Sequence, residues 1–336
     1  MRAACVTSFT GLDGLRVREV APPSPGADEV LVAVHTVGAN QLDLNTMRGL
    51  GPGADSPLPL VLGVDPAGTV VDQGPDVAGD RRGERVVVKP NVSCGDCAYC
   101  RRRQEADCPA QTVVGVHRAG GAAEYVSVPA RNAFAIGDLD FDLATAAVHS
   151  VPIALHAIVA GGGITAGETM LVTGATGAVG SAAVQLGLHF GARVLAASTS
   201  RSLDGPGVRA VRYEDPASLA AQVGPGGVDL AVDATGHGDV IGAALRCLGW
   251  KGRLVVCSAS LSTDVRVDAR ALYLRRQTVF GVASADYAEV AEALRLVASG
   301  AVRPPIGARF GLADIGAAYE AVGDRAREGK VVVHVT

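Results

Sequence analysis

The 336-residue sequence has few aromatic residues, a small net charge and no long uninterrupted apolar run. It contains only six Phe, six Tyr and one Trp, so no aromatic cluster outlines a substrate pocket. The formal net charge is −4, which gives no indication of a nucleic-acid or acidic-membrane partner. The most apolar stretch, residues 143–160, is interrupted by His149, Pro152 and His156, and it does not predict a transmembrane helix. The N-terminus lacks the apolar segment of a signal peptide, and we expect a cytoplasmic protein.

Length and composition predict two globular domains. Hydrophobic residues make up 48% of the chain and charged residues 19%, which is enough apolar material for a large core. Residues 1–148 contain short β-branched runs bounded by Gly, Pro or Asp, which predict a β-rich domain. From about residue 168, strand-like and helix-like segments alternate at βαβ spacing, which predicts an α/β fold with a doubly wound parallel sheet. We therefore predict a Rossmann domain at 149–284 and a tail at 285–336 that folds back onto the first domain.

Four of the seven cysteines lie close together in the sequence. They are Cys94, Cys97, Cys100 and Cys108. Their spacing, C-x2-C-x2-C-x7-C, favours a tetrahedral Zn²⁺ site with four thiolate ligands. A site with four protein ligands has no open position, so the metal is predicted to be structural and to fix its loop. The alternatives are unrelated thiols or disulfides, but grouped cysteines in this context favour reduced thiols in the cytosol.

A glycine-rich turn follows the strand-like segment at 171–173. Gly174, Gly177 and Gly180 form a G-x-x-G-x-x-G frame that leads into a helix-like segment. Such glycines permit a tight turn and let backbone N–H groups approach a pyrophosphate at a helix N-terminus. The alternative is an ordinary glycine-rich turn. The predicted cofactor-binding residues here are Gly174, Ala175, Thr176, Gly177, Ala178, Val179 and Gly180.

The end of the next strand-like segment is expected to select the cofactor. It carries Ser198, Thr199, Ser200 and Arg201, and no carboxylate that would bind the ribose 2′-hydroxyl of NAD. Hydroxyl groups and a guanidinium suit a 2′-phosphate. We therefore expect NADPH, with its 2′-phosphate bound by Ser198, Ser200 and Arg201. The alternative for Arg201 is a solvated loop charge.

With these motifs in view, the chain resembles the medium-chain dehydrogenase/reductase superfamily over nearly its whole length. The segments VTGATGAVGSAAVQLG and AREGKVVVHV are similar to the quinone oxidoreductase branch, whereas the four-cysteine loop is similar to the zinc alcohol dehydrogenase branch. The resemblance implies a GroES-like catalytic domain beside the Rossmann domain. It also implies that Tyr213 lines the adenosine side of the cofactor. Finally, it implies that cofactor domains pair edge to edge through a last strand, here 278–283.

Alcohol dehydrogenases of this family hold a second, catalytic zinc through a Cys, a His in a G-H-E motif and a later Cys or Asp. Motif matching puts Asn40 in place of the first Cys and Val64 in place of the His. Asp65 stands in place of the Glu, and Ser150 lies at or near the third ligand. Asn, Val and Ser cannot form a tight Zn²⁺ site. The N-x-x-D pattern of Asn40 and Asp43 is instead similar to the zinc-free quinone and enoyl reductases.

Without a catalytic metal, alcohol oxidation lacks its main catalyst, whereas hydride addition to an activated C=C bond needs only hydrogen-bond donors around an enolate. The leading hypothesis is an NADPH-dependent reductase of an α,β-unsaturated carbonyl compound or a quinone. The candidate catalytic residues are Asn40, Asp43, His149 and His156. Asn40 would orient the substrate or the nicotinamide ribose, and either histidine would act as general acid. The two histidines are seven residues apart, on one face of a helix. Each candidate has a purely structural alternative, such as a helix N-terminal acid for Asp43.

Two further hypotheses stay open. One is a zinc-free carbonyl reductase or alcohol dehydrogenase that uses His149 or His156 as acid and base. The other is a non-catalytic NADPH-binding protein that acts through its oligomer. In all three cases the partner is a small molecule or cofactor. An unpaired apolar strand at 278–283 is a liability, so we also expect a C₂ homodimer.

Overall fold

The computed structural model describes the chain with the exception of residues 201–202, 259–261, 263, 325–327 and 336. The chain forms two compact units. The first comprises Met1–His149, Val290–Ala298 and Ile306–Thr336. The second comprises Ser150–Glu289 and Ser299–Pro305. The division differs from the predicted one at its edges, because His149 clusters with the first unit, and residues 285–289 and 299–305 cluster with the second.

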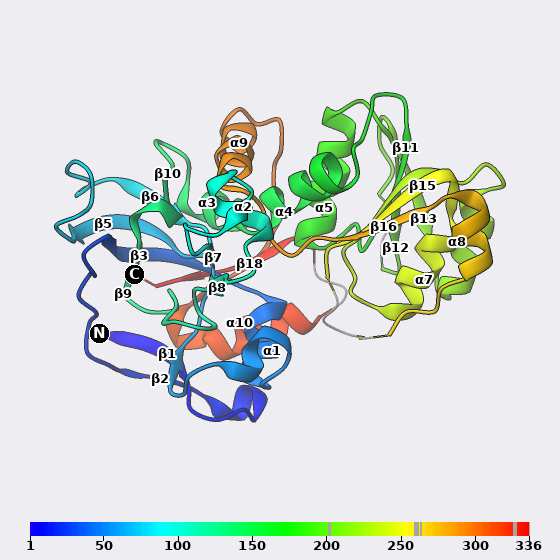
Figure 1. Cartoon of the computed structure of the whole chain (residues 1–336). Coiled ribbons are helices and arrows are strands. Elements are labelled where there is room, and N and C mark those ends of the chain that lie inside the picture. The colour runs from blue at the N-terminus through cyan, green and yellow to red at the C-terminus, as the bar shows by residue number, and fades with distance from the viewer. Residues whose placement is uncertain (201–202, 259–261, 263, 325–327, 336) are drawn as a thin grey trace. The chain divides into compact units, whose positions relative to one another are not determined.

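The first unit is built on an antiparallel sheet with the order β10-β6-β5-β3-β18-β17, in which only the β17–β18 pair is parallel, and β9 also pairs with β3 (Figure 1). Two smaller sheets are β2-β1-β4 and β7-β8. The strands are β1 Arg2–Val6, β2 Leu15–Glu19, β3 Glu29–Ala39, β4 Leu60–Val61, β5 Ala67–Gln73, β6 Arg85–Val88, β7 Asn91–Val92, β8 Thr112–Val113, β9 Tyr125–Pro129, β10 Ala133–Ala135, β17 Ile306–Gly311 and β18 Lys330–His334. The last strand pairs with β3, with Val333 opposite Val37, so the tail completes the sheet of the first unit.

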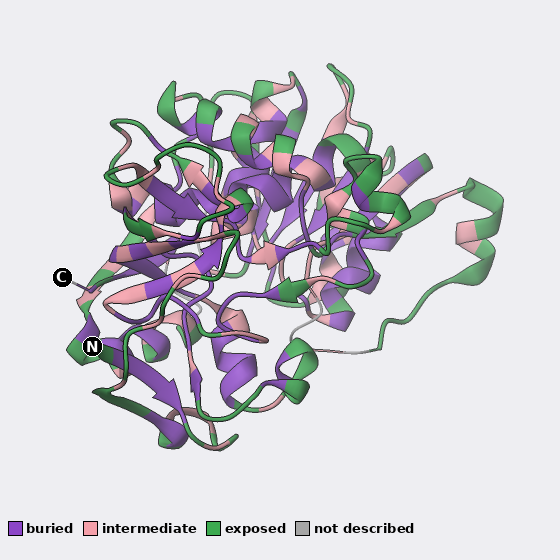
Figure 2. Cartoon of the chain, turned by 60° about the vertical axis from the view of Figure 1, so that its left-hand side comes forward, coloured by how far each residue is buried: buried purple, intermediate pink, exposed green. Residues whose placement is uncertain are grey.

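Alternation along β3 explains how this sheet forms its core. Val30, Val32 and Val34 are fully buried, and the residues between them are partly exposed, as expected for side chains on opposite faces of a strand. Figure 2 shows the buried residues concentrated on strands and helix faces. The helices associated with this unit are α1 Gln41–Met47, α2 Ala98–Arg101, α3 Phe141–Val148, α9 Tyr287–Ala298 and α10 Ile315–Gly323. Its 3₁₀ helices are η1 Gly11–Gly14, η2 Gly51–Asp55, η3 Glu105–Asp107, η4 Ala130–Asn132 and η7 Leu312–Asp314.

The second unit is a six-stranded sheet in which every pair is parallel, with the order β13-β12-β11-β14-β15-β16. The predicted α/β class with a doubly wound parallel sheet is thereby confirmed. The strands are β11 Thr169–Thr173, β12 Arg193–Ser198, β13 Val208–Arg212, β14 Val228–Asp233, β15 Leu248–Val256 and β16 Thr278–Gly281. The helices are α4 Ser150–His156, the π-helix η5 Ala157–Gly161, α5 Ala178–His189, the 3₁₀ helix η6 Pro216–Ser218, α6 Leu219–Val223, α7 Gly238–Arg246 and α8 Ala269–Arg275. The strand order reverses between β11 and β14, and ligands of such sheets bind at the carboxyl ends of the strands at this point.

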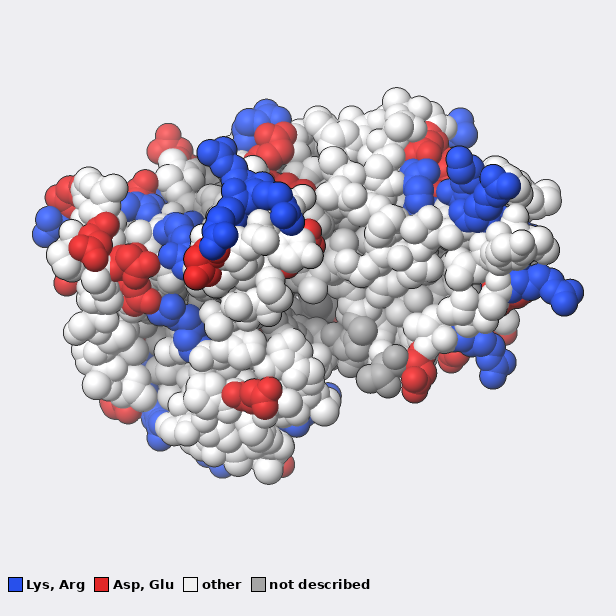
Figure 3. Space-filling model, viewed as in Figure 1, with Lys and Arg blue, Asp and Glu red and all other residues white. Residues whose placement is uncertain are grey.

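One helical stretch, Phe141–Gly161, is long and apolar enough to cross a membrane by length and composition alone. Most of its apolar window, 72%, is buried inside the protein, as in a core helix. Pro152, expected to interrupt this stretch, is the third residue of α4. On the face shown in Figure 3, acidic and basic side chains are interspersed, in keeping with the small net charge.

Candidate active site and metal centre

The four cysteines of the first unit converge as the spacing predicts. The Sγ–Sγ distances are 3.5 Å from Cys97 to Cys100, 3.6 Å from Cys108 to Cys94 and 3.9 Å from Cys94 to Cys100. Four thiolates placed tetrahedrally 2.3 Å from Zn²⁺ lie about 3.8 Å apart. The donor set and its spacing therefore fit a structural zinc, and all four sulfurs are unpaired thiols rather than disulfides. The predicted four-cysteine cluster is confirmed.

The glycine turn of the second unit lies between β11 and α5. Gly174 has a φ of +67°, which favours glycine, and a Cβ on Gly180 would lie 2.1 Å from the carbonyl oxygen of Gly174. Gly177 is the N-cap of α5 and has no side chain to occupy the first N–H groups of the helix, those of Ala178, Val179 and Gly180. These donors and the positive end of the helix dipole fit the pyrophosphate of a dinucleotide.

Asp233 is a residue of this region that the sequence pattern did not single out. It ends β14 directly beside Thr173, the last residue of β11, at the point where the strand order reverses. The buried carboxylate accepts hydrogen bonds from the Thr173 hydroxyl at 2.5 Å, the Thr235 hydroxyl at 2.8 Å and the Gly236 N–H at 3.0 Å. Burial raises the pKa of Asp233. Asp233 thus fixes the turn at 234–236 against the glycine turn, since Gly174 packs on Ala234 and Thr235. The sequence signal that could have identified Asp233 is its place as a carboxylate at the end of the apolar run VDLAVD.

At the end of β12, Ser198 is buried and Ser200 is partly exposed. The Ser200 N–H donates to the Ser198 hydroxyl at 3.2 Å, and the two hydroxyl groups are 3.2 Å apart. Arg201 lies outside the described residues. Tyr213 follows β13 and is 4% exposed, with its ring in the apolar core of the sheet. The ring is therefore part of the core of the sheet, and its contact with the adenosine stays a prediction from family resemblance.

Asn40 lies in a buried polar cluster of the first unit. Its Nδ2 donates to the Gly38 carbonyl at 3.1 Å and to both carboxylate oxygens of Asp65 at 3.2 Å. Its Oδ1 accepts a hydrogen bond of 2.5 Å from the Lys330 ammonium, which also forms an ion pair with Asp65. Lys330 is 3% exposed and Asp65 is 0% exposed. Gly38 leaves the space for this pair, because a Cβ there would lie 2.3 Å from Lys330 Cε.

Lys330 was not expected in the site. It precedes three buried valines in β18, and a charged residue that enters a buried strand needs a partner. That partner could not be identified from sequence, because Asp65 is 265 residues away along the chain. The structure thus assigns Asp65 the role of counter-ion to Lys330.

Asp43 is fully buried in the first turn of α1. Its carboxylate accepts the backbone N–H of Asn40 at 2.9 Å and that of Gly63 at 3.2 Å. Burial, with the nearby Asp65 charge, raises the pKa of Asp43 to about 7. The side chain is closed off from solvent and holds the start of the helix against the turn at Gly63. Asp43 therefore has the position of a helix N-terminal acid, the structural alternative given above, and not that of a group in direct contact with a substrate.

His149, by contrast, is only partly buried. Its Nδ1 lies 3.4 Å from Oδ1 of Asn40. Burial, together with the positive charge of Lys330, lowers the pKa of His149 to about 4. The ring is therefore neutral at pH 7 and lacks the extra proton of an imidazolium acid.

His156 has different partners, in the second unit. Its Nδ1 lies 2.7 Å from a carboxylate oxygen of Glu289, whose carboxylate also accepts the backbone N–H of Asp286. The structure thus places His149 and His156 in separate hydrogen-bonded clusters, one with Asn40 and one with Glu289. The seven-residue spacing had placed both histidines on one face of a helix.

The other positions matched to catalytic zinc ligands carry no strong donor. Val64 is fully buried in an apolar cluster with Val113 and Val116, and Ser150 is also buried.

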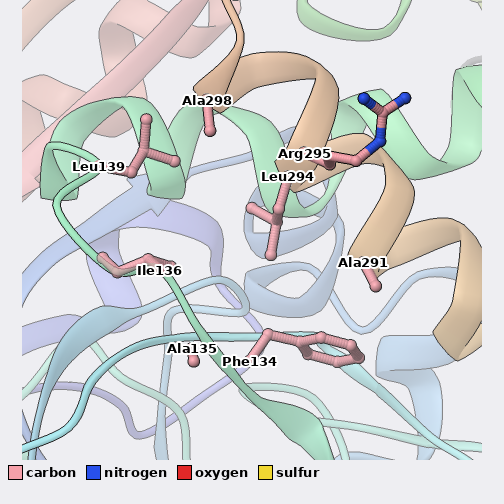
Figure 4. A pocket seen from close by; sticks show the side chains of 8 residues that line it. All are labelled: Phe134, Ala135, Ile136, Leu139, Ala291, Leu294, Arg295 and Ala298. Carbon is pink, nitrogen blue, oxygen red and sulfur yellow. The ribbon is translucent and has the colours of Figure 1, made fainter.

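A separate cavity of about 230 Å³ in the first unit, between β10 and α9, is lined mainly by apolar side chains (Figure 4). Its one charged group, Arg295, is paired with Glu292, so this cavity offers no catalytic chemistry.

Comparison with known proteins identifies the fold family. The profile of the alcohol dehydrogenase GroES-like domain matches residues 26–138, and that of the zinc-binding dehydrogenase matches residues 208–333. The acryloyl-coenzyme A reductase of Metallosphaera sedula is 28% identical over 95% of this chain and 96% of its own. A solved NAD-dependent alcohol dehydrogenase has a TM-score of 0.92 and 29% identity, with 100% of both chains covered.

A thermostable alcohol dehydrogenase from Pyrobaculum aerophilum is 32% identical, with 100% of this chain and 99% of that chain covered and a TM-score of 0.89. Full-length similarity at this level, together with both domain profiles, shows the family. The chain belongs to the medium-chain dehydrogenase/reductase superfamily and is an oxidoreductase enzyme.

Proposed function

We propose that this enzyme uses NADPH to reduce the activated C=C bond of an α,β-unsaturated carbonyl compound, without a catalytic zinc. The observation that carries the proposal is the Lys330 ammonium, hydrogen-bonded to Asn40 and ion-paired with Asp65. Asn40 and Asp65 stand where zinc-dependent relatives are expected to have a Cys ligand and the Glu of the G-H-E motif. The ammonium group already occupies the oxygen atoms of Asn40 and Asp65 that a divalent cation would need in the same place.

The donor set supports the same conclusion. Zn²⁺ in proteins is bound by thiolates, imidazoles and carboxylates. Asn40 offers an amide oxygen that already accepts from Lys330, and Val64 offers no donor atom. Within the described part of the chain, two groups could hold a metal ion: the four-cysteine loop, and His156 with Asp286 and Glu289. Only the first brings thiolates together, and neither includes Asn40, Val64 or Ser150. The zinc of this protein is therefore assigned to that loop.

The cofactor preference rests on the end of β12. Ser198 and Ser200 carry hydroxyl groups there, and no carboxylate is present to repel a 2′-phosphate. Arg201, which follows them in the sequence, would supply the charge. When bound, NADPH supplies a hydride from C4 of its nicotinamide. The glycine turn and the N-terminus of α5 would hold its pyrophosphate, and Asp233 fixes the neighbouring turn.

Reduction of a C=C bond suits such a site. A hydride added to the β-carbon leaves an enolate, whose oxygen needs hydrogen-bond donors rather than a Lewis acid. The enolate α-carbon then takes a proton. The similarity to an acryloyl-coenzyme A reductase supports this reaction, since acryloyl-coenzyme A is an α,β-unsaturated thioester.

The second candidate is a zinc-free carbonyl reductase, favoured by the similarity to two solved alcohol dehydrogenases. Product analysis with a simple enone and NADPH deuterated at the 4R or 4S position separates the two. Deuterium at the β-carbon supports C=C reduction, whereas deuterium at the carbinol carbon shows carbonyl reduction. No transfer from either form of NADPH to a panel of enones, quinones and aldehydes would favour a non-catalytic NADPH-binding protein.

The proposed assembly is a homodimer formed through β16. This strand is an edge of the parallel sheet, and all four of its residues are exposed. Val279 is 46% exposed and Phe280 is 40% exposed. The preceding helix, α8, has no buried residue and exposes Tyr273. An unpaired strand edge beside exposed apolar side chains is a surface that isologous pairing would cover.

A further inference from the structure

The charged neighbours of Asn40 leave its side-chain amide a single favourable orientation. An ammonium group only donates hydrogen bonds, so the atom that faces Lys330 must be the amide oxygen. A carboxylate only accepts, so the atom that faces Asp65 must be the amide nitrogen, which also donates to the carbonyl of Gly38. If the amide were flipped, its NH₂ group would face the Lys330 ammonium, a second donor, and its oxygen would face the Asp65 carboxylate, a second acceptor. The Asp65–Lys330 pair thus sets the orientation of Asn40.

This orientation decides which nitrogen of His149 carries the proton. Nδ1 of the ring faces Oδ1 of Asn40, which is an acceptor, at 3.4 Å. An unprotonated Nδ1 would set two lone pairs against each other, so the neutral ring carries its proton on Nδ1. Nε2 then has a free lone pair. Among the described residues, the contact with Asn40 is the only hydrogen bond of the His149 ring, and the residue as a whole is partly exposed.

We propose that Asp65 and Lys330 are positioning residues that act through Asn40 to fix His149 as its Nδ1–H tautomer, so that Nε2 accepts a hydrogen bond from a hydroxyl-bearing ligand. The inference about the tautomer stands on the protein alone. The identity of the ligand rests on the proposed function: for enone reduction it is the water molecule that protonates the enolate.

The step balances without a further reagent. Hydride from NADPH forms the C–H bond at the β-carbon, the C=C electron pair moves to the enolate, and NADP⁺ is left. A water O–H bond then breaks as the α-carbon takes the proton, and the resulting hydroxide is neutralised by a solvent proton. His149 holds this water through Nε2 and donates no proton of its own. The charged groups that act on His149 are Lys330, Lys89 and Asp65, and the lowered pKa of His149 is consistent with a neutral ring.

The decisive experiment is long-range ¹H–¹⁵N correlation spectroscopy at pH 7 on protein labelled with ¹⁵N-histidine. The chain has seven histidines, and His149→Gln assigns the signal. The expected result is that the Cδ2 proton of His149 correlates with an unprotonated nitrogen, which marks the Nδ1–H tautomer. A protonated Nε2 in the unmodified protein would overturn the inference, whatever happens with the variants.

Two variants test the positioning roles. Asn40→Leu removes the acceptor and is expected to release His149 to the Nε2–H tautomer. The double variant Asp65→Asn, Lys330→Met removes both charges together, so that neither is left buried alone, and is expected to give a mixture of tautomers. If the double variant folds and keeps a pure Nδ1–H signal, Asp65 and Lys330 do not position Asn40. If it does not fold, the unmodified protein and Asn40→Leu still decide whether Asn40 fixes the tautomer.

Asp268→Ala is the matched control, because it removes the N-cap of α8 in the second unit and leaves the Asn40 cluster intact. Asn40→Leu should also lower kcat/KM for the enone by more than about tenfold with NADPH affinity unchanged, a loss that Asp268→Ala should not reproduce. The two proposals can fail separately. An Nδ1–H signal in a protein that reduces no enone would refute the reaction alone, and an Nε2–H signal in an active enone reductase would refute the tautomer alone.

Discussion

The buried carboxyl group of Asp43 predicts that the first unit loses stability as pH rises through the neutral range. Its pKa is raised from 3.8 to about 7 because the side chain is fully buried near the negative charge of Asp65. The folded state therefore holds this proton more tightly than the unfolded chain does. The contribution of the protonated group to the free energy of unfolding has its full value below about pH 4. It falls as the pH rises towards 7 and changes no further above that.

The size of the effect follows from the pKa difference. One pKa unit corresponds to about 1.4 kcal/mol, so the whole transition amounts to roughly 4 kcal/mol. Between pH 5.5 and pH 8, Asp43 should lower the free energy of unfolding by about 2 kcal/mol. In Asp43→Asn this contribution to the pH dependence should vanish, whatever the absolute stability of the variant.

Urea unfolding at pH 5.5 and pH 8, followed by circular dichroism, measures this difference. Tryptophan fluorescence is a poor probe here, because the single Trp, Trp250, lies in the second unit. The control is Thr46→Ala, which removes a buried hydroxyl from the same helix without removing a titratable group. It should lose about 1 kcal/mol at both pH values. If Asp43→Asn and the unmodified protein show the same pH dependence, Asp43 is already ionised at pH 5.5 and the argument from burial is wrong.

Four further predictions concern the metal, the cofactor and the assembly. Elemental analysis should find one zinc per chain, and Cys97→Ser should lose the zinc and lower the melting temperature; two zincs per chain would contradict the assignment. Gly180→Ala should weaken NADPH binding in a titration while the sheet stays folded, because its Cβ would lie 2.1 Å from the Gly174 oxygen. Arg201→Ala should weaken NADPH by about 1.5–3 kcal/mol and leave NADH almost unchanged, so that equal losses would exclude a 2′-phosphate contact. Phe280→Lys should convert a dimer into a monomer in light scattering, and an unmodified protein that is already monomeric at micromolar concentration would refute the proposed pairing.

The sequence predicted the features of the protein that depend on local spacing. The cysteine loop and the glycine turn are formed by residues close together in the chain, so their patterns carry the geometry directly. The alternation of strands and helices likewise specified the parallel sheet. For Tyr213, resemblance gives a position in the chain but not the direction of the side chain; the structure buries the ring, and its contact with the cofactor stays a prediction.

Only some members of the polar cluster around Asn40 could be predicted from the sequence. Asn40, Asp43 and Asp65 were recognised by motif, but Lys330 joins them from the opposite end of the chain through the pairing of β18 with β3. Sequence spacing also grouped His149 with His156, which the structure assigns to different partners. Contacts that depend on sheet register and long-range pairing carry no local signal, and the roles of these side chains follow from those contacts.

The ammonium group of Lys330 also limits what the proposed active site can do. A zinc ion with an open position binds a substrate oxygen directly and lowers the pKa of a bound hydroxyl. Lys330 is 3% exposed, and its hydrogen bonds go to Asn40 and Asp65, so it presents no open position to a substrate. In the proposed site, it supplies a fixed charge that orients Asn40 and that adds to the effect of burial, which lowers the pKa of His149. Such a site suits a substrate that carries the developing charge itself, as an enone does through its own carbonyl, better than an alcohol that must first be deprotonated.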